Sequence, residues 1–100
     1  MPDGMDEQSR NLGRDVEALE RDRAIGMAKR LYRQRLDEGW DLSNGPCLSD
    51  ESIPGWCVDV AHDPREPVDG LPQNQCPAYR SGRVRHFVEL DRQGSLIRAQ

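Results

Sequence analysis

The chain has 100 residues, of which 35% are hydrophobic and 32% are charged, so it has material for one domain with a small core. No apolar run comes near the roughly 18 residues that a membrane-spanning helix requires, and the first residues lack the basic and apolar regions of a signal peptide. The expected location is the cytoplasm, with no membrane partner.

Charge is distributed unevenly, although the net charge is only −4. Residues 1–40 are nearly balanced, residues 41–70 carry seven acids and one base, and residues 71–100 carry five bases and two acids. A net acidic chain disfavours nonspecific binding to nucleic acid, whereas a polarised surface favours docking to a complementary partner.

The N-terminal residues predict a flexible tail over residues 1–12, followed by a single domain over residues 13–100, because the first stretch is polar and contains nothing apolar enough to anchor it. The domain begins with an expected amphipathic helix from about Arg14 to Glu38, a stretch without proline and rich in strong helix formers. Its apolar residues recur at spacings of three and four: Val16, Leu19, Ala24, Ile25, Met27, Ala28, Leu31, Tyr32 and Leu36.

Two glycines carry expectations for this helix. Gly26 lies in its middle at a cost of about 1 kcal/mol relative to alanine, which predicts either a close approach by another segment or a break into two helices. Gly39 is the expected stop.

The next segments alternate between loops and strands. Residues 40–54 contain several turn-forming pairs and predict an ordered loop, with one helical turn starting near Ser49. Residues 55–62 alternate in period two between Pro54 and Pro64, which predicts the core strand with one buried face. Residues 63–77 predict a second long loop, which contains four prolines and packs back onto the body.

The C-terminal quarter predicts a β-hairpin, with alternation over residues 83–91, a turn at Gly94 and a returning strand over residues 95–99. A further short strand is considered over residues 78–80. The predicted fold is α+β: one long N-terminal helix packed on a small, mainly antiparallel sheet of three to four strands.

The least demanding functional hypothesis is a small intracellular protein-interaction module without enzymatic activity, which docks on a protein partner or on a second copy of itself. Arginine and tryptophan are enriched in the residues that dominate binding energy. The candidate partner-binding residues are therefore Arg30, Arg33, Trp40, Tyr79, Arg83 and Arg85.

A structural zinc site is the first alternative. Two thiolates and two imidazoles, from Cys47, His62, Cys76 and His86, would suit tetrahedral zinc. The spacing is unfavourable because no two of these residues are close in sequence. The competing interpretations are buried histidines with cysteines as small core residues, or a bridge between Cys47 and Cys76, which a reducing cytosol disfavours.

Nucleic-acid binding is the second alternative, because arginines interleaved with aromatic rings can contact phosphates and stack on unpaired bases. The residues concerned are Tyr79, Arg80, Arg83, Arg85, His86 and Phe87. The same arginines also suit a solvated, edge-protecting face of a sheet.

A cysteine-dependent enzyme is the third alternative. Cys47 would be the nucleophile, with His62 or His86 as the base and Asp59 or Asp63 orienting that base. So small a domain has little volume in which to enclose a substrate.

Overall fold

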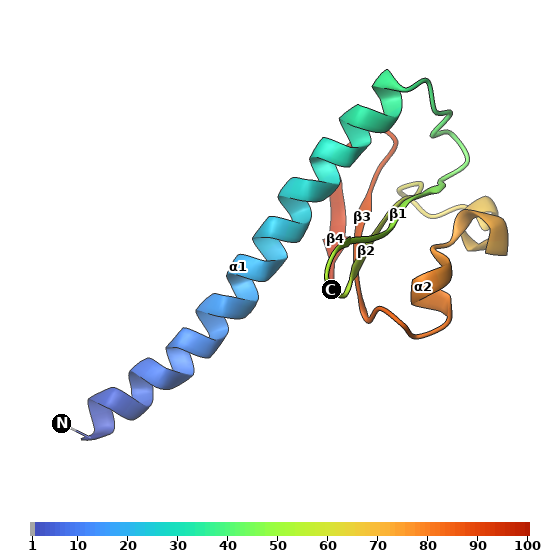
Figure 1. The fold of residues 1–100 in the computed structure, drawn as a ribbon. Helices are drawn as coiled ribbons and strands as arrows, with labels where there is room; N and C mark the ends of the chain where they lie inside the picture. The colour runs from blue at the N-terminus through green and yellow to red at the C-terminus, as the bar shows by residue number, and fades with distance from the viewer. Residues whose placement is uncertain (1) are drawn as a thin grey trace.

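The computed structural model describes the backbone of residues 2–100 and the side chains of residues 16–100. One long helix, α1 (Pro2–Asp37), lies against a sheet of four strands (Figure 1). The predicted tail over residues 1–12 falls outside the described side chains and stays a prediction. The remaining elements are β1 (Cys47–Ile53), β2 (Trp56–Val60), two 3-10 turns, η1 (Pro67–Gly70) and η2 (Pro72–Asn74), then the short helix α2 (Pro77–Arg80), β3 (His86–Leu90) and β4 (Leu96–Ala99).

The sheet has the order β1-β2-β3-β4. The pairs β1·β2 and β3·β4 are antiparallel, whereas β2 and β3 run parallel, in register from Trp56 opposite His86 to Val60 opposite Leu90. The parallel pair requires a crossover, which residues 61–85 supply with η1, η2 and α2. The predicted α+β class with a mainly antiparallel sheet is thus confirmed.

The fourth strand is not where the sequence placed it. Residues 47–53, predicted to be loop, form β1, and Pro54-Gly55 makes the hairpin turn into β2, with φ of +86° at Gly55. β1 pairs irregularly, with two register shifts against β2, so the regular alternation that marks a strand is missing. Residues 78–80, considered as a strand, belong instead to α2, which begins at Pro77 and whose Ala78 amide donates to Asp50.

α1 packs closely on one face of the sheet because small residues lie at the contact. Ala24 and Ala28, four residues apart, are fully buried against Val58, Val88 and Leu90.

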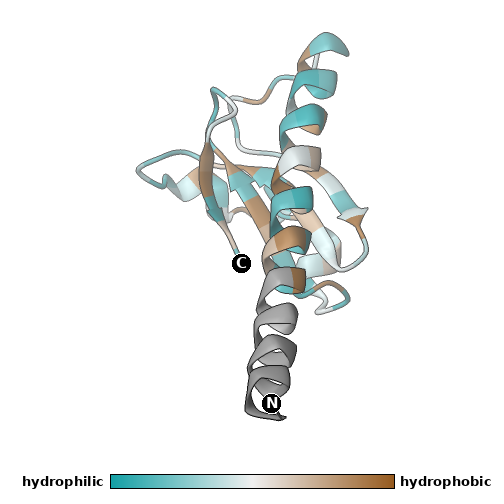
Figure 2. Ribbon diagram, turned by 90° about the vertical axis from the view of Figure 1, so that its left-hand side faces the viewer, coloured by the Kyte–Doolittle hydropathy of each residue, from teal (hydrophilic) through white to brown (hydrophobic). Residues whose placement is uncertain are grey.

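Four side-chain hydrogen bonds also join α1 to the rest of the domain. The Trp56 indole donates to Glu20, Arg21 donates to the Ala99 carbonyl, Arg35 donates to the Leu48 carbonyl and the Tyr32 hydroxyl donates to the Arg92 carbonyl. In Figure 2, α1 crosses the sheet with hydrophobic and hydrophilic residues interspersed along it.

The helix ends as predicted but is less amphipathic than predicted. It stops at Asp37, and Gly39 follows with φ of +85°, a left-handed C-terminal stop. Val16 and Leu19 are 58% and 62% exposed, although both belong to the predicted apolar face. Gly26 neither breaks the helix nor meets another segment: a Cβ there would have nothing within 4 Å.

The crossover after β2 is anchored by one buried carboxylate. Asp69 accepts hydrogen bonds from the backbone amides of His62 and Glu66, and His62 Nδ1 lies 2.9 Å from its Oδ1. Burial opposes its ionisation, but these hydrogen bonds lower the pKa of Asp69 below its usual value. The long loop is therefore tied down beside the end of β2.

Gly45 makes room for this anchor. It has φ of +71°, and an added Cβ would come 2.5 Å from the Asp69 carboxylate and 2.7 Å from the Val60 carbonyl. We expect Gly45→Ala to lower the free energy of unfolding by about 2 kcal/mol, because of the left-handed backbone and the displaced carboxylate. Urea unfolding would measure this, with Gly70→Ala as the control, since a Cβ at Gly70 meets nothing within 4 Å.

Candidate functional site

The four predicted zinc ligands do not come together. Cys47 and Cys76 are joined in a disulfide, with Cα atoms 5.0 Å apart, as one of the alternative interpretations of the sequence had it. His62 lies in the buried anchor at the end of β2, and His86 stacks on Trp56 with ring centroids 4.7 Å apart, on the face that carries α1. The sheet thus separates His86 from the two cysteines.

One group of metal-type side chains does exist within the described residues. Ligating atoms of Cys47, Asp50 and Cys76 lie within 4.8 Å of one another. The two sulfurs are bonded to each other, and Asp50 already accepts from the Ala78 amide and from Arg83 at 2.6 Å. These atoms are occupied by structural bonds.

The thiols are not arranged for nucleophilic catalysis. Cys47, the predicted nucleophile, has its sulfur in the disulfide. Cys57 is free but buried, and burial together with the charges of Asp59 and Asp50 raises its pKa to about 12. At neutral pH Cys57 is therefore a protonated, unreactive thiol.

The basic and aromatic residues predicted to bind nucleic acid do not share one exposed strand. Tyr79 and Arg80 are in α2, Arg83 is paired with Asp50, and β3 lies inside the sheet rather than at its edge. Phe87 is partly buried and packs edge-to-face with the Tyr79 ring, with centroids 5.3 Å apart. Of the six residues predicted to bind nucleic acid, only Arg80 and Arg85 have exposed side chains without an ion pair or an aromatic contact among the described residues.

The predicted partner-binding residues divide between two regions. Arg30 and Arg33 are exposed on α1, and Trp40, just past its end, is 41% exposed beneath the Arg35 guanidinium, which lies 4.6 Å from the ring centroid. The other members, Tyr79, Arg83 and Arg85, belong to α2 and the segment that follows it.

Two hollows of about 470 and 430 Å³ lie along one side of α1, next to the β1–β2 turn. They share Leu19, Arg23 and Ile53. Exposed α1 residues follow this side at alternating spacings of three and four; we call them the α1 strip: Val16, Leu19, Arg23, Gly26, Arg30 and Arg33. The strip is apolar at one end and basic at the other, and its three arginines make no ion pair within the described residues.

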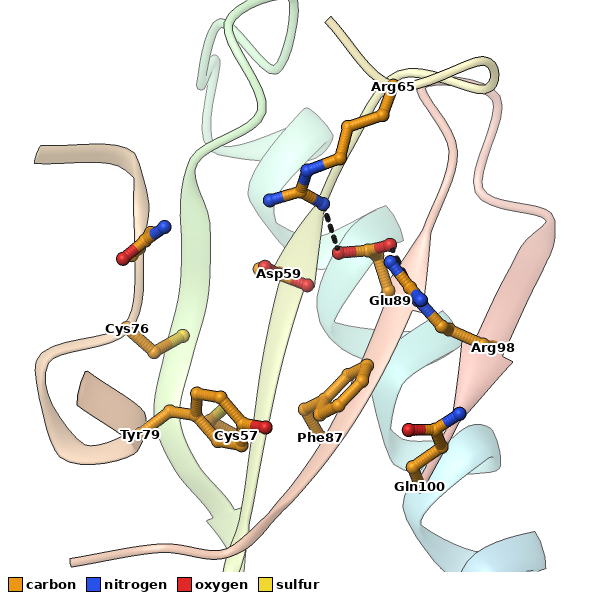
Figure 3. A pocket seen from close by; sticks show the side chains of 10 residues that line it. Cys57, Asp59, Arg65, Cys76, Tyr79, Phe87, Glu89, Arg98 and Gln100 are labelled. Atoms are coloured by element: carbon orange, nitrogen blue, oxygen red, sulfur yellow. Dashed lines mark hydrogen bonds and ion pairs between the residues drawn. The ribbon is translucent and has the colours of Figure 1, made fainter. Parts of the chain in front are cut away.

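A third hollow, which we call the sheet pocket, lies on the face opposite α1 and holds about 350 Å³ (Figure 3). Its floor is formed by alternate residues of β2 and β3, and its walls come from the crossover and from the end of the chain. The lining residues are Cys57, Asp59, Arg65, Gln75, Cys76, Tyr79, Phe87, Glu89, Arg98 and Gln100.

The charges of the sheet pocket are arranged around Glu89. Arg65 Nη1 donates to Glu89 Oε2 at 3.2 Å, and Arg98 Nε donates to Glu89 Oε1 at 3.3 Å (Figure 3). Asp59, opposite Glu89 in the parallel register, takes no part: its buried Oδ1 has no hydrogen-bond partner. Burial, and then the Glu89 carboxylate, raise the pKa of Asp59 to about 7.

The sequence contains little that predicts this pocket. Asp59 is predicted only as a residue that orients a histidine, and no role is predicted for Arg65, Glu89 or Arg98. The available signal was a charged residue inside each of two apolar strands, Asp59 between Val58 and Val60, and Glu89 between Val88 and Leu90. This alternation is the ordinary pattern of a strand with one buried and one solvated face, so it places the two carboxylates opposite the core but does not predict that their face is enclosed.

Within residues 2–100, no helix combines the length and apolar character that crossing a membrane demands. Comparison with known proteins adds nothing further to the assignment: no protein-family model, no curated protein and no solved structure matches this chain.

Proposed function

We propose that this protein is a non-enzymatic interaction module whose α1 strip docks an acidic, amphipathic segment of a partner protein. The observation that supports this most strongly is the strip itself, where three exposed arginines continue a line that starts with exposed Val16 and Leu19. Exposed apolar residues beside exposed arginines are typical of protein-binding surfaces. Two acidic residues, Glu20 and Asp22, line the same hollows.

The charge of the strip favours a partner over a second copy of the chain. Arg23, Arg30 and Arg33 would repel the same arginines of a symmetric copy, whereas glutamates or aspartates would complement them. The hollows beside Leu19 and Ile53 offer places for apolar side chains of the same segment. Exposed Gly26, which serves no contact inside the chain, leaves a flat place on the helix where a partner side chain can approach.

The predicted location and the two predicted alternatives, zinc and nucleic-acid binding, are not part of this proposal. Cytoplasmic location stays a prediction, and the Cys47–Cys76 disulfide weighs against it, because disulfides persist mainly in oxidising compartments. The zinc and nucleic-acid alternatives receive no support from the positions of their residues.

Docking can be tested with a synthetic helical peptide that has leucines three and four residues apart and glutamates elsewhere. We expect it to bind with an affinity that falls as salt rises, and the double change Arg30→Glu and Arg33→Glu to weaken binding at least tenfold. Isothermal titration calorimetry at two salt concentrations would measure this.

The matched controls are the same peptide with lysine in place of glutamate, and Arg80→Glu, which reverses an exposed charge on α2. Equal binding of the acidic and basic peptides, or equal loss in Arg80→Glu, would contradict a specific acidic partner. A native mass of two chains that reverts to one in Leu19→Glu would show that a second copy covers the strip instead.

A further inference from the structure

The sheet pocket has an unused acceptor. Asp59 Oδ1 is buried without a partner, on a strand otherwise lined by Cys57, Val58 and Val60. A carboxylate with one oxygen buried and without a hydrogen bond is costly to ionise, and a donor bound at the pocket-facing side of the same carboxylate would offset that cost. A cationic donor relieves it most, because it also offsets the charge of the Asp59 carboxylate itself, whereas Glu89 is already paired with Arg65 and Arg98.

The same pocket has unused donors. Arg98 uses Nε for Glu89, while its two terminal nitrogens have no partner among the described residues, and its side chain is 48% exposed. The guanidinium carbon lies over the Phe87 ring, 5.8 Å from its centroid. A guanidinium with two free nitrogens is suited to a carboxylate.

The spacing of the two groups sets the size of the ligand. Asp59, Glu89 and Arg98 lie opposite one another on three adjacent strands, so the backbones of Asp59 and Arg98 are about 10 Å apart. The Glu89 side chain lies between these two residues and is already bonded to Arg98. A ligand that joins them therefore passes over Glu89, with its ammonium group near the Asp59 and Glu89 carboxylates and its own carboxylate at the terminal nitrogens of Arg98. Phe87, Tyr79 and Cys57 supply an apolar surface below this line (Figure 3).

We propose that the sheet pocket binds a free α-amino acid with an apolar side chain, whose ammonium group donates to Asp59, whose carboxylate accepts from Arg98 and whose side chain lies on Phe87. This site lies on the face of the sheet opposite α1, so the proposal does not depend on docking at the α1 strip. Its volume of about 350 Å³ suits a molecule of this size.

Three matched probes separate the contributions. L-phenylalanine carries both charges, 3-phenylpropionate lacks the ammonium group, and phenethylamine lacks the carboxylate. In amide-resolved NMR titrations of the intact chain, we expect L-phenylalanine to bind at least tenfold more tightly than either of the others, with shifts centred on Asp59, Phe87 and Gln100.

Binding should also depend on pH, because the ammonium group needs an ionised Asp59. The charged groups that face Asp59 are Glu89 from β3, Arg98 from β4, and Arg65 and Asp69 from the crossover. With the pKa of Asp59 at about 7, the affinity for L-phenylalanine should be about tenfold higher at pH 8 than at pH 6.

Two variants complete the test. Asp59→Asn should remove the pH dependence and weaken L-phenylalanine binding at least tenfold, and Arg98→Gln should bring the affinities of L-phenylalanine and phenethylamine together. Arg80→Gln, outside the pocket, should change neither. Absence of shifts with millimolar L-phenylalanine, or equal affinity for 3-phenylpropionate, would overturn the proposal.

Discussion

Asp59→Asn should raise the free energy of unfolding at pH 8 by about 3 kcal/mol. In the wild-type protein the Asp59 side chain is partly buried, its Oδ1 atom is fully buried without a hydrogen bond, and it lies beside Glu89. Its pKa is about 7, against 3.8 for the free side chain, and each unit of difference corresponds to about 1.4 kcal/mol. Asparagine keeps the shape and removes the charge, although its amide remains buried, so the gain is smaller than the full difference of about 4 kcal/mol.

The pH dependence of stability has a definite sign. Between about pH 4 and pH 7 the unfolded chain has lost the Asp59 proton while the folded chain retains it, so rising pH favours unfolding across this window. Above about pH 7 both states are ionised and the effect is constant. The lowered pKa of Asp69 acts oppositely, but only below its usual value, outside this window.

Urea unfolding of the wild-type and Asp59→Asn proteins at intervals from pH 4 to pH 8 would measure both effects. Asp63→Asn is the matched control, because it removes an exposed aspartate four residues away. A wild-type stability that stays level across this range, or a loss of stability in Asp59→Asn at pH 8, would contradict the buried, unpartnered carboxylate.

The parts of the fold that the sequence predicted are those with a regular pattern. The helix around Ala24 and Ala28 follows three-and-four spacing, β2 places Trp56, Val58 and Val60 on its core face, and Gly94 marks the β3–β4 turn with φ of +87°. β1 has no such pattern, because register shifts on both sides of Ser49 break the alternation. Residues 47–53 were therefore predicted to be loop. The parallel pairing of β2 with β3 was not predicted either.

The candidate sites depend on contacts that a single sequence does not encode. His62 and His86 follow the apolar phase of their strands, which predicted a shared site, but one completes the Asp69 anchor and the other stacks on Trp56. Asp59 and Glu89 become neighbours only because β2 and β3 pair in parallel. Arg65 and Arg98 reach Glu89 from segments on either side of β3, a convergence set by tertiary packing.

Reducing the Cys47–Cys76 disulfide should lower the free energy of unfolding by about 3.5 kcal/mol. The bond closes a sequence separation of 29 residues, and a crosslink over a loop of that length restricts the unfolded chain by about this amount. It also ties β1 to the start of α2, across the small cluster that contains Cys57, Ala78 and Val84. For a domain with so small a core, such a loss is a large part of the total stability.

Paired unfolding curves with and without reductant would measure the loss, and the double change Cys47→Ala and Cys76→Ala should match the reduced protein. Thiol counting provides the control. Under non-reducing conditions the native protein should show no rapidly reacting thiol, since Cys57 is buried with its pKa raised to about 12, and the denatured protein should show one.

Three thiols in the denatured, unreduced protein would contradict the disulfide and restore Cys47 and Cys76 as separate sulfurs. Zinc binding by these two residues and a bond between them exclude each other, because thiolates bind the metal and a disulfide has none. One thiol without metal would instead leave the disulfide as the link that holds the crossover on the sheet. The wall of the sheet pocket that Gln75 and Cys76 form would then be fixed by a covalent bond.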